Sequence, residues 1–205
     1  MTKWVLGTRD SAGYKVFNVR THISMTDGNM DVDNLHLDAK NKTIVEMVMP
    51  DMWNDVIDAL RSQPNVQVLE ATPTGFPHYM FMDNIIKENS VMTFQGNAGQ
   101  PGQYIKYAIT SAGTTTTMEV TQTVQYKPGK VVAVETITVP GGSFVCSKWQ
   151  YAMDNTQEFK QNGNFLTSKS FHEDITLWTA HGVGVVKSVN VTETGESTTQ
   201  LIKIE

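Results

Sequence analysis

Alternation of apolar and polar side chains runs through most of the chain and predicts β-strands. In Tyr14–Met25 the apolar residues Phe17, Val19 and Ile23 stand at alternate positions, with polar residues between them. This period of two is typical of a strand with one buried and one solvated face. Similar segments, separated by turn residues such as Ala112-Gly113, are Lys3–Thr8, Met30–Asp38, Thr43–Met49, Val66–Ala71, Tyr104–Ser111, Thr114–Tyr126, Lys130–Val139, Phe144–Met153, a strand of undefined length from Thr156, Phe165–Thr179, Val183–Val191 and Ser197–Ile204.

One segment, Asp51–Ser62, has the spacing of a helix instead. Pro50 stands before it and Pro64 follows it, as expected at the ends of a helix. A single apolar stripe must be buried against another element, and the concave face of a sheet is the simplest one. The residues of this stripe are Met52, Trp53, Val56, Ile57 and Leu60.

The pattern is weakest in Thr72–Gly102, where glycine and proline are frequent, and we expect long connections around Asn84–Thr93. No βαβ alternation and no internal repeat occur. The sequence therefore predicts a mainly β fold: a curved antiparallel sheet, or an open or closed β-barrel, of about ten strands wrapping one amphipathic helix. We expect one β-rich domain over residues 1–205, and the only place for a boundary is near residues 72–102.

Composition agrees with this fold and excludes several classes of partner. The 205 residues include 25 Thr and 22 Val, which are stiff at χ1 and favour strands. A net charge of −5 without a basic stripe argues against nucleic-acid binding. No apolar run approaches the roughly 18 residues of a membrane span. The N-terminus lacks a signal-peptide core, so the protein is either cytoplasmic or shown here without its export signal.

An acidic segment superficially resembles a calcium loop, because oxygen ligands stand at alternate positions. Val32 occupies the sixth position, where the loop needs glycine, and no helices flank the segment. A solvated hairpin is the favoured interpretation, and the sequence leaves cation binding open. The residues concerned are Asp27, Asn29, Asp31, Asp33 and Asp38.

Candidate catalytic residues are isolated from one another. The tripeptide His172-Glu173-Asp174 carries acid and base groups, but alternation places His172 and Asp174 on one face as solvated side chains. Ser143 lies in a turn without a nearby base, and the single cysteine, Cys146, is expected to be an inert packed thiol. We predict no catalytic residues, no metal ligands and no cofactor. The five histidines, scattered without ligand spacing, are His22, His36, His78, His172 and His181.

Eleven methionines are the least usual feature of the composition. Core packing is the favoured interpretation, a pocket for a hydrophobic ligand is second, and a thioether copper site is third. The spacings that raise this question are those of Met47, Met49, Met52, Met80 and Met82. The glycines of Gly182-Val183-Gly184 lack the strand–loop–helix context of a phosphate loop, so we expect a bend or close strand packing there.

Two segments of the last third, TVPGGSFVCSKWQY and DITLWTAHGVGVVKS, together with the closing TTQLIKIE, carry a family resemblance. They resemble bacterial secreted lipoprotein domains of unknown function, the TapB-like family and related periplasmic half-barrels. The chain departs from that pattern at Gly141, Ser143, Ser147 and His181. The matching residues are Thr138, Val139, Pro140, Gly142, Phe144, Cys146, Lys148, Trp178, Ala180, Gly182, Val183, Gly184, Val186, Lys187 and Ser188.

The resemblance implies a curved antiparallel sheet around a helix, export, and a lipid anchor in the periplasm or at the outer membrane. No lipid-attachment motif occurs in these 205 residues. We therefore expect a non-enzymatic envelope protein that binds a hydrophobic molecule or lipid on the concave face of its sheet. The alternatives are a structural or assembly module with an envelope protein partner, and an unrecognised hydrolase.

Overall fold

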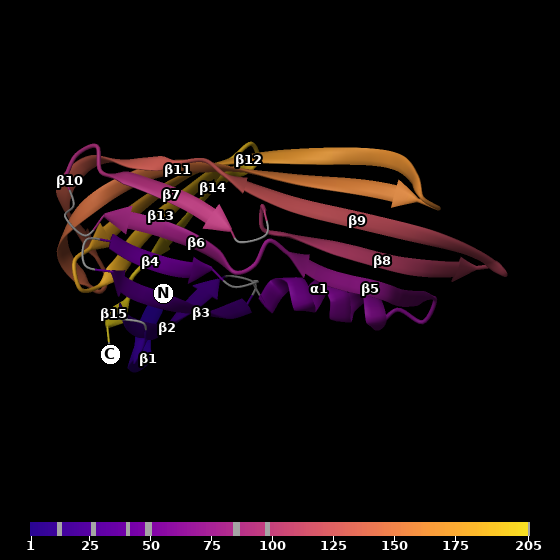
Figure 1. Ribbon diagram of the computed structural model, residues 1–205, viewed down its shortest axis with the longest axis horizontal. Helices are drawn as coiled ribbons and strands as arrows, with labels where there is room; N and C mark the ends of the chain where they lie inside the picture. Colours follow the sequence, from indigo (N-terminus) through magenta and orange to yellow (C-terminus); the bar gives the residue numbers. More distant parts are fainter. Residues whose placement is uncertain are drawn as a thin grey trace.

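The computed structural model describes residues 1–11, 14–25, 28–39, 42–47, 51–83, 87–96 and 99–204. In this part of the chain, fifteen strands form a single twisted sheet, and one helix accompanies them (Figure 1). The elements are β1 (Thr2–Ser11), β2 (Tyr14–Met25), β3 (Gly28–Ala39), β4 (Lys42–Met47), α1 (Asp51–Arg61), β5 (Val66–Thr74), β6 (His78–Asp83), β7 (Val91–Gly96), β8 (Gly102–Ser111), β9 (Thr114–Tyr126), β10 (Gly129–Val139), β11 (Gly142–Gln161), β12 (Asn164–Ala180), β13 (Gly184–Thr192), β14 (Gly195–Gln200) and β15 (Lys203–Ile204).

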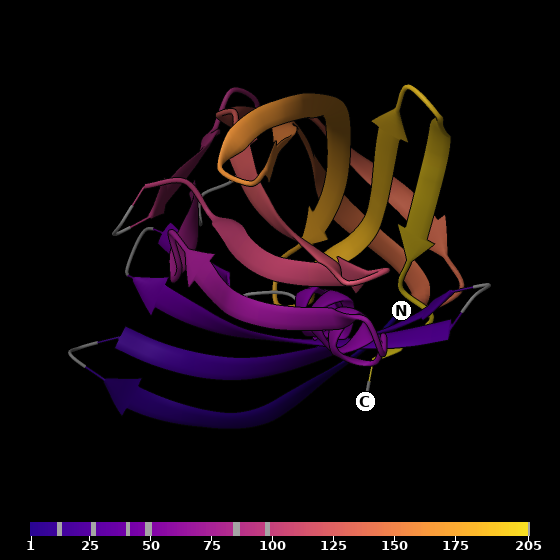
Figure 2. The same ribbon diagram turned by 90° about the vertical axis from the view of Figure 1, so that its right-hand side faces the viewer.

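The predicted fold class is confirmed. Neighbouring strands are antiparallel except for β1 and the short β15, which are parallel. The sheet curves strongly around its interior (Figure 2). In the main strand order, β14 is the first strand and β15 is the last. Within the described residues no ladder joins these two ends, so the sheet is open and not a closed barrel.

The long strand β11 divides the sheet into two branches. Its first half, Gly142–Gln150, pairs with β10, whereas its second half, Met153–Gln161, pairs with β9. The β10 branch continues through β7, β6, β4, β3 and β2 to β1, and the β9 branch continues through β8 to β5. The helix α1 packs along β5 at the end of the second branch (Figure 1). We call the point where β9 and β10 meet β11 the fork.

Two tight turns explain the long hairpins that project from the body (Figure 1). The Ala112-Gly113 pair has φ angles of 48° and 79°, and the Asn162-Gly163 pair has φ angles of 51° and 78°. Two successive positive φ angles define the type I′ turn, whose twist matches that of antiparallel strands. The Asn162 side chain accepts a hydrogen bond of 2.9 Å from the Thr117 N–H, which ties the tip of β11 to β9.

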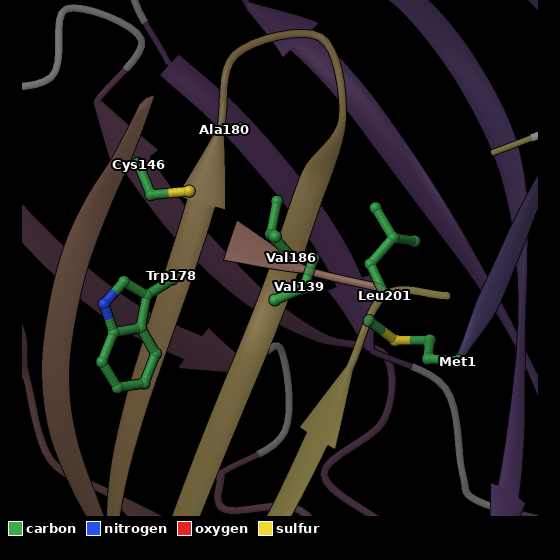
Figure 3. Close-up of a cluster of buried hydrophobic side chains, with 7 residues drawn as sticks. All are labelled: Met1, Val139, Cys146, Trp178, Ala180, Val186 and Leu201. Carbon is green, nitrogen blue, oxygen red and sulfur yellow. The ribbon is translucent and has the colours of Figure 1, made fainter. Parts of the chain in front are cut away.

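The buried core consists of two apolar clusters. In the first, Met1 and Leu201 lie beside Val139 and Val186 (Figure 3). Leu201 also connects the edges of the sheet, since its N–H donates to Val186 O and the N–H of Ile202 donates to Met1 O. The second cluster lies on the inner face near the fork and consists of Met92, Val131, Trp149, Ile175 and Leu177.

Several sequence predictions need correction. The stretch 72–102 is more regular than expected, since it contains β6 and β7, and β5 extends into it as far as Thr74. Glycine and proline indicated the connections correctly, but the short strands between them, β6 and β7, were not predicted. These strands are stabilised by pairing with β4 and β10. Instead of about ten strands there are fifteen in the described residues. The segments Phe144–Met153 and the strand from Thr156 form one strand, β11, and Ser197–Ile204 is interrupted at Leu201.

The helix forms where it was predicted, but its apolar stripe is only partly buried. Ile57 is buried, whereas Val56 is 51% exposed, contrary to the prediction that both lie on the packed face. The side chains of Met52 and Trp53 lie outside the described residues, as do residues 12–13, 26–27, 40–41, 48–50, 84–86, 97–98 and 205.

Candidate binding surface on the inner face

A row of side chains crosses four strands of the β10 branch on one face of the sheet. His36 of β3 is opposite Val45 of β4, Val45 is opposite Met80 of β6, and Met80 is opposite Phe94 of β7. Directly opposed residues share a face. Because Met80 and Phe94 pack against the buried cluster around Trp149, this face is the inner one. We call these four residues the inner row.

The inner row ends at an aromatic stack at the fork. The rings of Phe94 and Tyr126 are 4.8 Å apart and nearly parallel, and Tyr126 is also stacked on His78 with centroids 5.6 Å apart. Tyr151 contacts Phe94 with centroids 5.2 Å apart. These rings come from β6, β7, β9 and β11. The branching at β11 therefore brings together aromatic side chains that are far apart in the sequence.

Part of the inner face keeps accessible surface, although Val45 of the inner row is 6% exposed and Met92 and Trp149 of the adjoining cluster are fully buried. His36, Met80, Phe94, Tyr126 and Tyr151 all keep an intermediate share of exposed surface, although they face the interior. Apolar and aromatic surface that remains accessible on a concave face is typical of ligand sites. Met80 adds a side chain of a type that adapts readily to irregular shapes.

His78 is the least satisfied polar residue at the fork. It is 2% exposed, and neither ring nitrogen has a hydrogen-bond partner in the described structure. Burial lowers the pKa of His78, so the ring is neutral. A Cβ atom on Gly96, which is opposite His78, would lie 2.6 Å from Nδ1, so only glycine leaves room for the ring. Gln103 Nε2, also buried, likewise lacks a partner among the described residues.

A positive charge lies at the other end of the inner face. Lys3 of β1 is opposite Thr21 and thus on the same face as Ile23, which packs against the first core cluster. Its Nζ lies 3.5 Å from the position that a Cβ atom on Gly184 would take. Burial lowers the pKa of Lys3 to about 8. Burial and the charge of Lys3 lower the pKa of His36 to about 4.

The two tyrosines of the stack remain neutral phenols. Burial, with the Glu173 carboxylate as a smaller influence, raises the pKa of Tyr126 to about 12. The pKa of Tyr151 is raised as well, first by burial. Glu173 itself accepts a hydrogen bond from Asn190 Nδ2. The fork therefore offers neutral hydroxyl and imidazole groups and the Glu173 carboxylate beside an apolar surface, whereas the charge at the other end of the face is positive.

The acidic segment predicted from the sequence is strand β3 and not a loop. Asp31 contacts His22 at 2.6 Å, and both Asp33 carboxylate oxygens accept hydrogen bonds from Arg20 at 2.7 and 2.8 Å. These partners are on β2, so the carboxylates lie along a ladder instead of converging. Asp27 falls outside the described residues. Among the residues with described positions, no group of three or more His, Cys, Asp or Glu side chains is placed to bind a metal ion.

The exposed residue His172 lies between two carboxylates on the outer face. Its Nδ1 is 2.7 Å from Asp154 Oδ1, its Nε2 is 3.4 Å from Asp174 Oδ1, and Lys127 contacts the other Asp154 oxygen at 2.9 Å. A shallow depression of about 590 Å³ beside this group is lined in part by Lys127 and Asp174. Since both ring nitrogens face carboxylates, the imidazole has no nitrogen left to activate a hydroxyl nucleophile.

Within the described part of the chain, the other candidate residues predicted from the sequence do not come together in a site. Cys146 is 1% exposed, and burial raises the pKa of its thiol, which fits an inert packed cysteine. Ser143 Oγ is 2.8 Å from Thr138 Oγ1 across the hairpin. Met80 and Met82 pack against the inner core cluster, and Met47 is opposite His78. His181 is exposed. Met49 and the side chain of Met52 lie outside the described residues.

Sequence reasoning missed the inner row, the stack and Lys3 as one surface. Alternation places Phe17 and Ile23 on one face, but nothing in the sequence distinguishes His36 from the other scattered histidines. The missing information is the register between strands, because a shift of one residue would turn every side chain to the opposite face.

Comparisons with known proteins place the chain in a family. A family model described as DUF3108-like matches residues 10–201. None of the curated proteins matches. No described helix has the length and apolar character needed to cross a membrane.

Two solved structures are similar to this one. The first is a candidate exported protein with a YmcC-like fold from Bacteroides fragilis, at 11% identity and a TM-score of 0.48. The second is a candidate lipoprotein from Parabacteroides distasonis, at 15% identity and a TM-score of 0.49. Each similarity covers 98% of this chain and 85% of the other.

Proposed function

We propose, from the premise that this chain belongs to the DUF3108-like family, that it is an exported envelope protein that binds a hydrophobic ligand. In this proposal the ligand lies on the inner face of the sheet, along the inner row, and is not chemically changed. Export and an envelope location are supported by the resemblance of the segments TVPGGSFVCSKWQY and DITLWTAHGVGVVKS to those of secreted lipoproteins. The narrower TapB-like affiliation and a lipid anchor stay predictions.

The observation that carries the proposal is the partial exposure of apolar side chains on a concave face. Met80 and Phe94 are held by strand pairing, yet the chain does not cover them fully. Burying accessible apolar surface contributes roughly 25 cal/mol per Å², so a ligand that covers this face is stabilised there.

The absence of catalysis is proposed on the chemistry of the best candidate residues. His172 is held between two carboxylates, and the thiol of Cys146 is buried with a raised pKa. A nucleophile needs an adjacent base with a free nitrogen or oxygen, and neither residue has this arrangement.

Binding of the neutral probe N-phenyl-1-naphthylamine tests the proposal. Wild-type protein should bind it saturably with an increase in fluorescence. Met80→Trp should block the inner face by filling it, whereas Val134→Trp is the matched control, because Val134 is 48% exposed elsewhere on the sheet. Thermal unfolding of both variants checks that they are folded. No saturable binding to the wild type, or equal binding to folded Met80→Trp, would contradict the proposal.

A second candidate function, an assembly module, is favoured by the free edge of β12. Residues 173–180 of β12 pair with β13, whereas residues 164–172 pair only with β11 in the described structure. This free part carries Phe165, Leu166 and Phe171, which are 63%, 53% and 50% exposed. An unpaired apolar edge is a site for strand addition by another chain.

Purification from the native envelope distinguishes this second candidate. A module of this kind should retain a stoichiometric protein partner through size-exclusion chromatography. Leu166→Asp should release the partner while leaving binding of the neutral probe unchanged. A protein that elutes without a partner in both forms argues against the assembly function.

A further inference from the structure

The Lys3 ammonium group on the inner face has no protein partner among the described residues. It forms no hydrogen bond or ion pair there, and no described carboxylate influences its pKa. Exposed lysines often lack partners, but Lys3 is half-buried and faces the interior of the sheet. Burying a charged group without a counter-charge destabilises the folded protein. A half-buried ammonium group without a partner therefore indicates a site for an anion.

The fold fixes this ammonium in place. The Lys3 backbone is paired on both sides, with Thr21 of β2 and with Ile204 of β15. The Lys3 ammonium group lies beside Gly184, at the start of β13. The segment Leu201–Ile202 holds β13 and the start of β1 together by hydrogen bonds to Val186 O and Met1 O. The Lys3 ammonium group therefore points from β1 toward β13.

A second polar group lies on the same face of the sheet as Lys3. His36 is opposite Phe17 of β2, and Phe17 shares a face with Thr21, the residue opposite Lys3. Burial and the Lys3 charge lower the pKa of His36, so the ring is neutral at pH 7 and one ring N–H is available to donate. His36 forms no hydrogen bond with a described residue. A charged donor together with a neutral donor is an arrangement that suits a carboxylate or phosphate oxygen.

The rest of the inner row is apolar and leads away from His36. Val45, which is 6% exposed, follows on the next strand, and then the partly exposed side chains of Met80 and Phe94. At a strand spacing of about 4.8 Å, the distance from His36 to Phe94 is roughly 14 Å. The inner face thus combines a cationic end and an apolar track of the length of a medium acyl chain.

We infer that the inner face binds a single-chain amphiphile with an anionic headgroup, with the headgroup at Lys3 and His36 and the chain over Met80 and Phe94. This inference rests on the proposed function, since it names the class of ligand for the same surface. A carboxylate and a phosphate monoester fit the headgroup position equally, so both are tested.

Calorimetric titration at pH 7 with four probes tests the inference: dodecanoate, dodecyl phosphate, 1-dodecanol and inorganic phosphate. The anionic amphiphiles should bind about tenfold more tightly than 1-dodecanol, which is typical of one charge-assisted contact. Inorganic phosphate should bind far more weakly than dodecyl phosphate, because it lacks the chain. Equal affinities for inorganic phosphate and dodecyl phosphate would mean a site for free anions and would overturn the inference.

Variants locate the headgroup. Lys3→Met keeps most of the length of the side chain and removes the charge, so the advantage of dodecanoate over 1-dodecanol should disappear while 1-dodecanol binds as before. Lys130→Met is the matched control, because Lys130 is an exposed lysine of β10. It should leave the advantage intact. Lys3→Arg should restore most of it. An advantage that persists in folded Lys3→Met would overturn the inference.

The outcomes separate this inference from the proposed function. If dodecanoate and 1-dodecanol bind the wild type equally, hydrophobic binding stands and the role of Lys3 is wrong. If none of the four probes binds, both proposals are wrong.

Discussion

The indole ring of Trp178 lies beside the ammonium group of Lys187, whose Nζ is 4.9 Å from the ring centroid. Lys148 approaches the same ring at 5.1 Å from the opposite neighbouring strand, and the indole N–H donates to Glu135 Oε1 at 2.7 Å. Register places Lys148, Trp178 and Lys187 side by side on β11, β12 and β13. Three residues of the motifs that carry the family resemblance thus form one contact, and their role is structural.

Replacing Trp178 should destabilise the protein. Trp178→Phe loses the hydrogen bond to Glu135 and weakens the contacts with both lysines, so we expect a loss of about 2 kcal/mol in the free energy of unfolding. Urea unfolding followed by circular dichroism measures it. Phe165→Leu, at a side chain that is 63% exposed, is the control and should change stability by less than about 0.5 kcal/mol. Equal stability of Trp178→Phe and wild type would show that the contact is unimportant.

The neutral state of His36 should make stability depend on pH. Its pKa is lowered to about 4 in the folded protein, whereas in the unfolded chain it is near 6.5. Between these values the unfolded state binds the extra proton. The stabilising contribution is therefore complete above pH 6.5 and is lost as pH falls toward 4.

The slope of this dependence is at most about 1.4 kcal/mol per pH unit, and smaller to the extent that solvent reaches the ring. Other groups titrate in the same range, so the measurement is the difference between wild type and His36→Asn in urea unfolding from about pH 7.5 to about pH 4.5. The variant should have the flatter profile. Parallel profiles would show that His36 titrates normally.

The histidine on the outer face should behave in the opposite way. Hydrogen bonding to Asp154, and then to Asp174, raises the pKa of His172. Its contribution is present below the unfolded pKa and is lost as pH rises through the raised folded value. An NMR titration of the ring protons should give a midpoint above the ordinary value of about 6.5, and Asp154→Asn should lower it. His22→Gln serves as the control and should leave the midpoint unchanged. A midpoint that Asp154→Asn does not move would contradict this account.

The two halves of β12 should differ in hydrogen exchange. Residues 173–180 lie between β11 and β13, whereas residues 164–172 pair on one side and are exposed. Amide protons of the second group that point away from β11 have no acceptor in the described structure and should exchange orders of magnitude faster. Mass-spectrometric exchange of peptides from both halves measures this. Equal protection would indicate that the free edge is covered in solution.

The sequence predicts the elements well where the signals are local. Helix α1 begins at Asp51 as expected, and the turn at Ala112-Gly113 lies where the pattern places it. The Asn162-Gly163 turn is absent from the sequence predictions, although asparagine followed by glycine is among the strongest hairpin signals. The short strands β6 and β7 are hidden by the glycines and prolines around them, because their stability depends on partners far away in the chain.

The candidate surface could not be predicted to the same extent. Lys3, His36 and Phe94 belong to no motif, and each lies on a different strand. Alternation shows only that a side chain faces one side or the other of its own strand. Which side chains become neighbours depends on strand order and register, and these are set by contacts between distant segments.

The sequence by itself determined the β-rich class, the position of the helix and the lack of a recognisable catalytic motif, because these follow from local periodicity, turn residues and composition. Only the tertiary structure decided that β9 and β10 both pair with β11, and that Tyr126 therefore stacks on His78 and Phe94. It also decided that Lys3 faces the interior. The physical reason is that backbone pairing between strands is nearly independent of side-chain identity. The register is therefore selected by the burial of apolar side chains over the whole sheet.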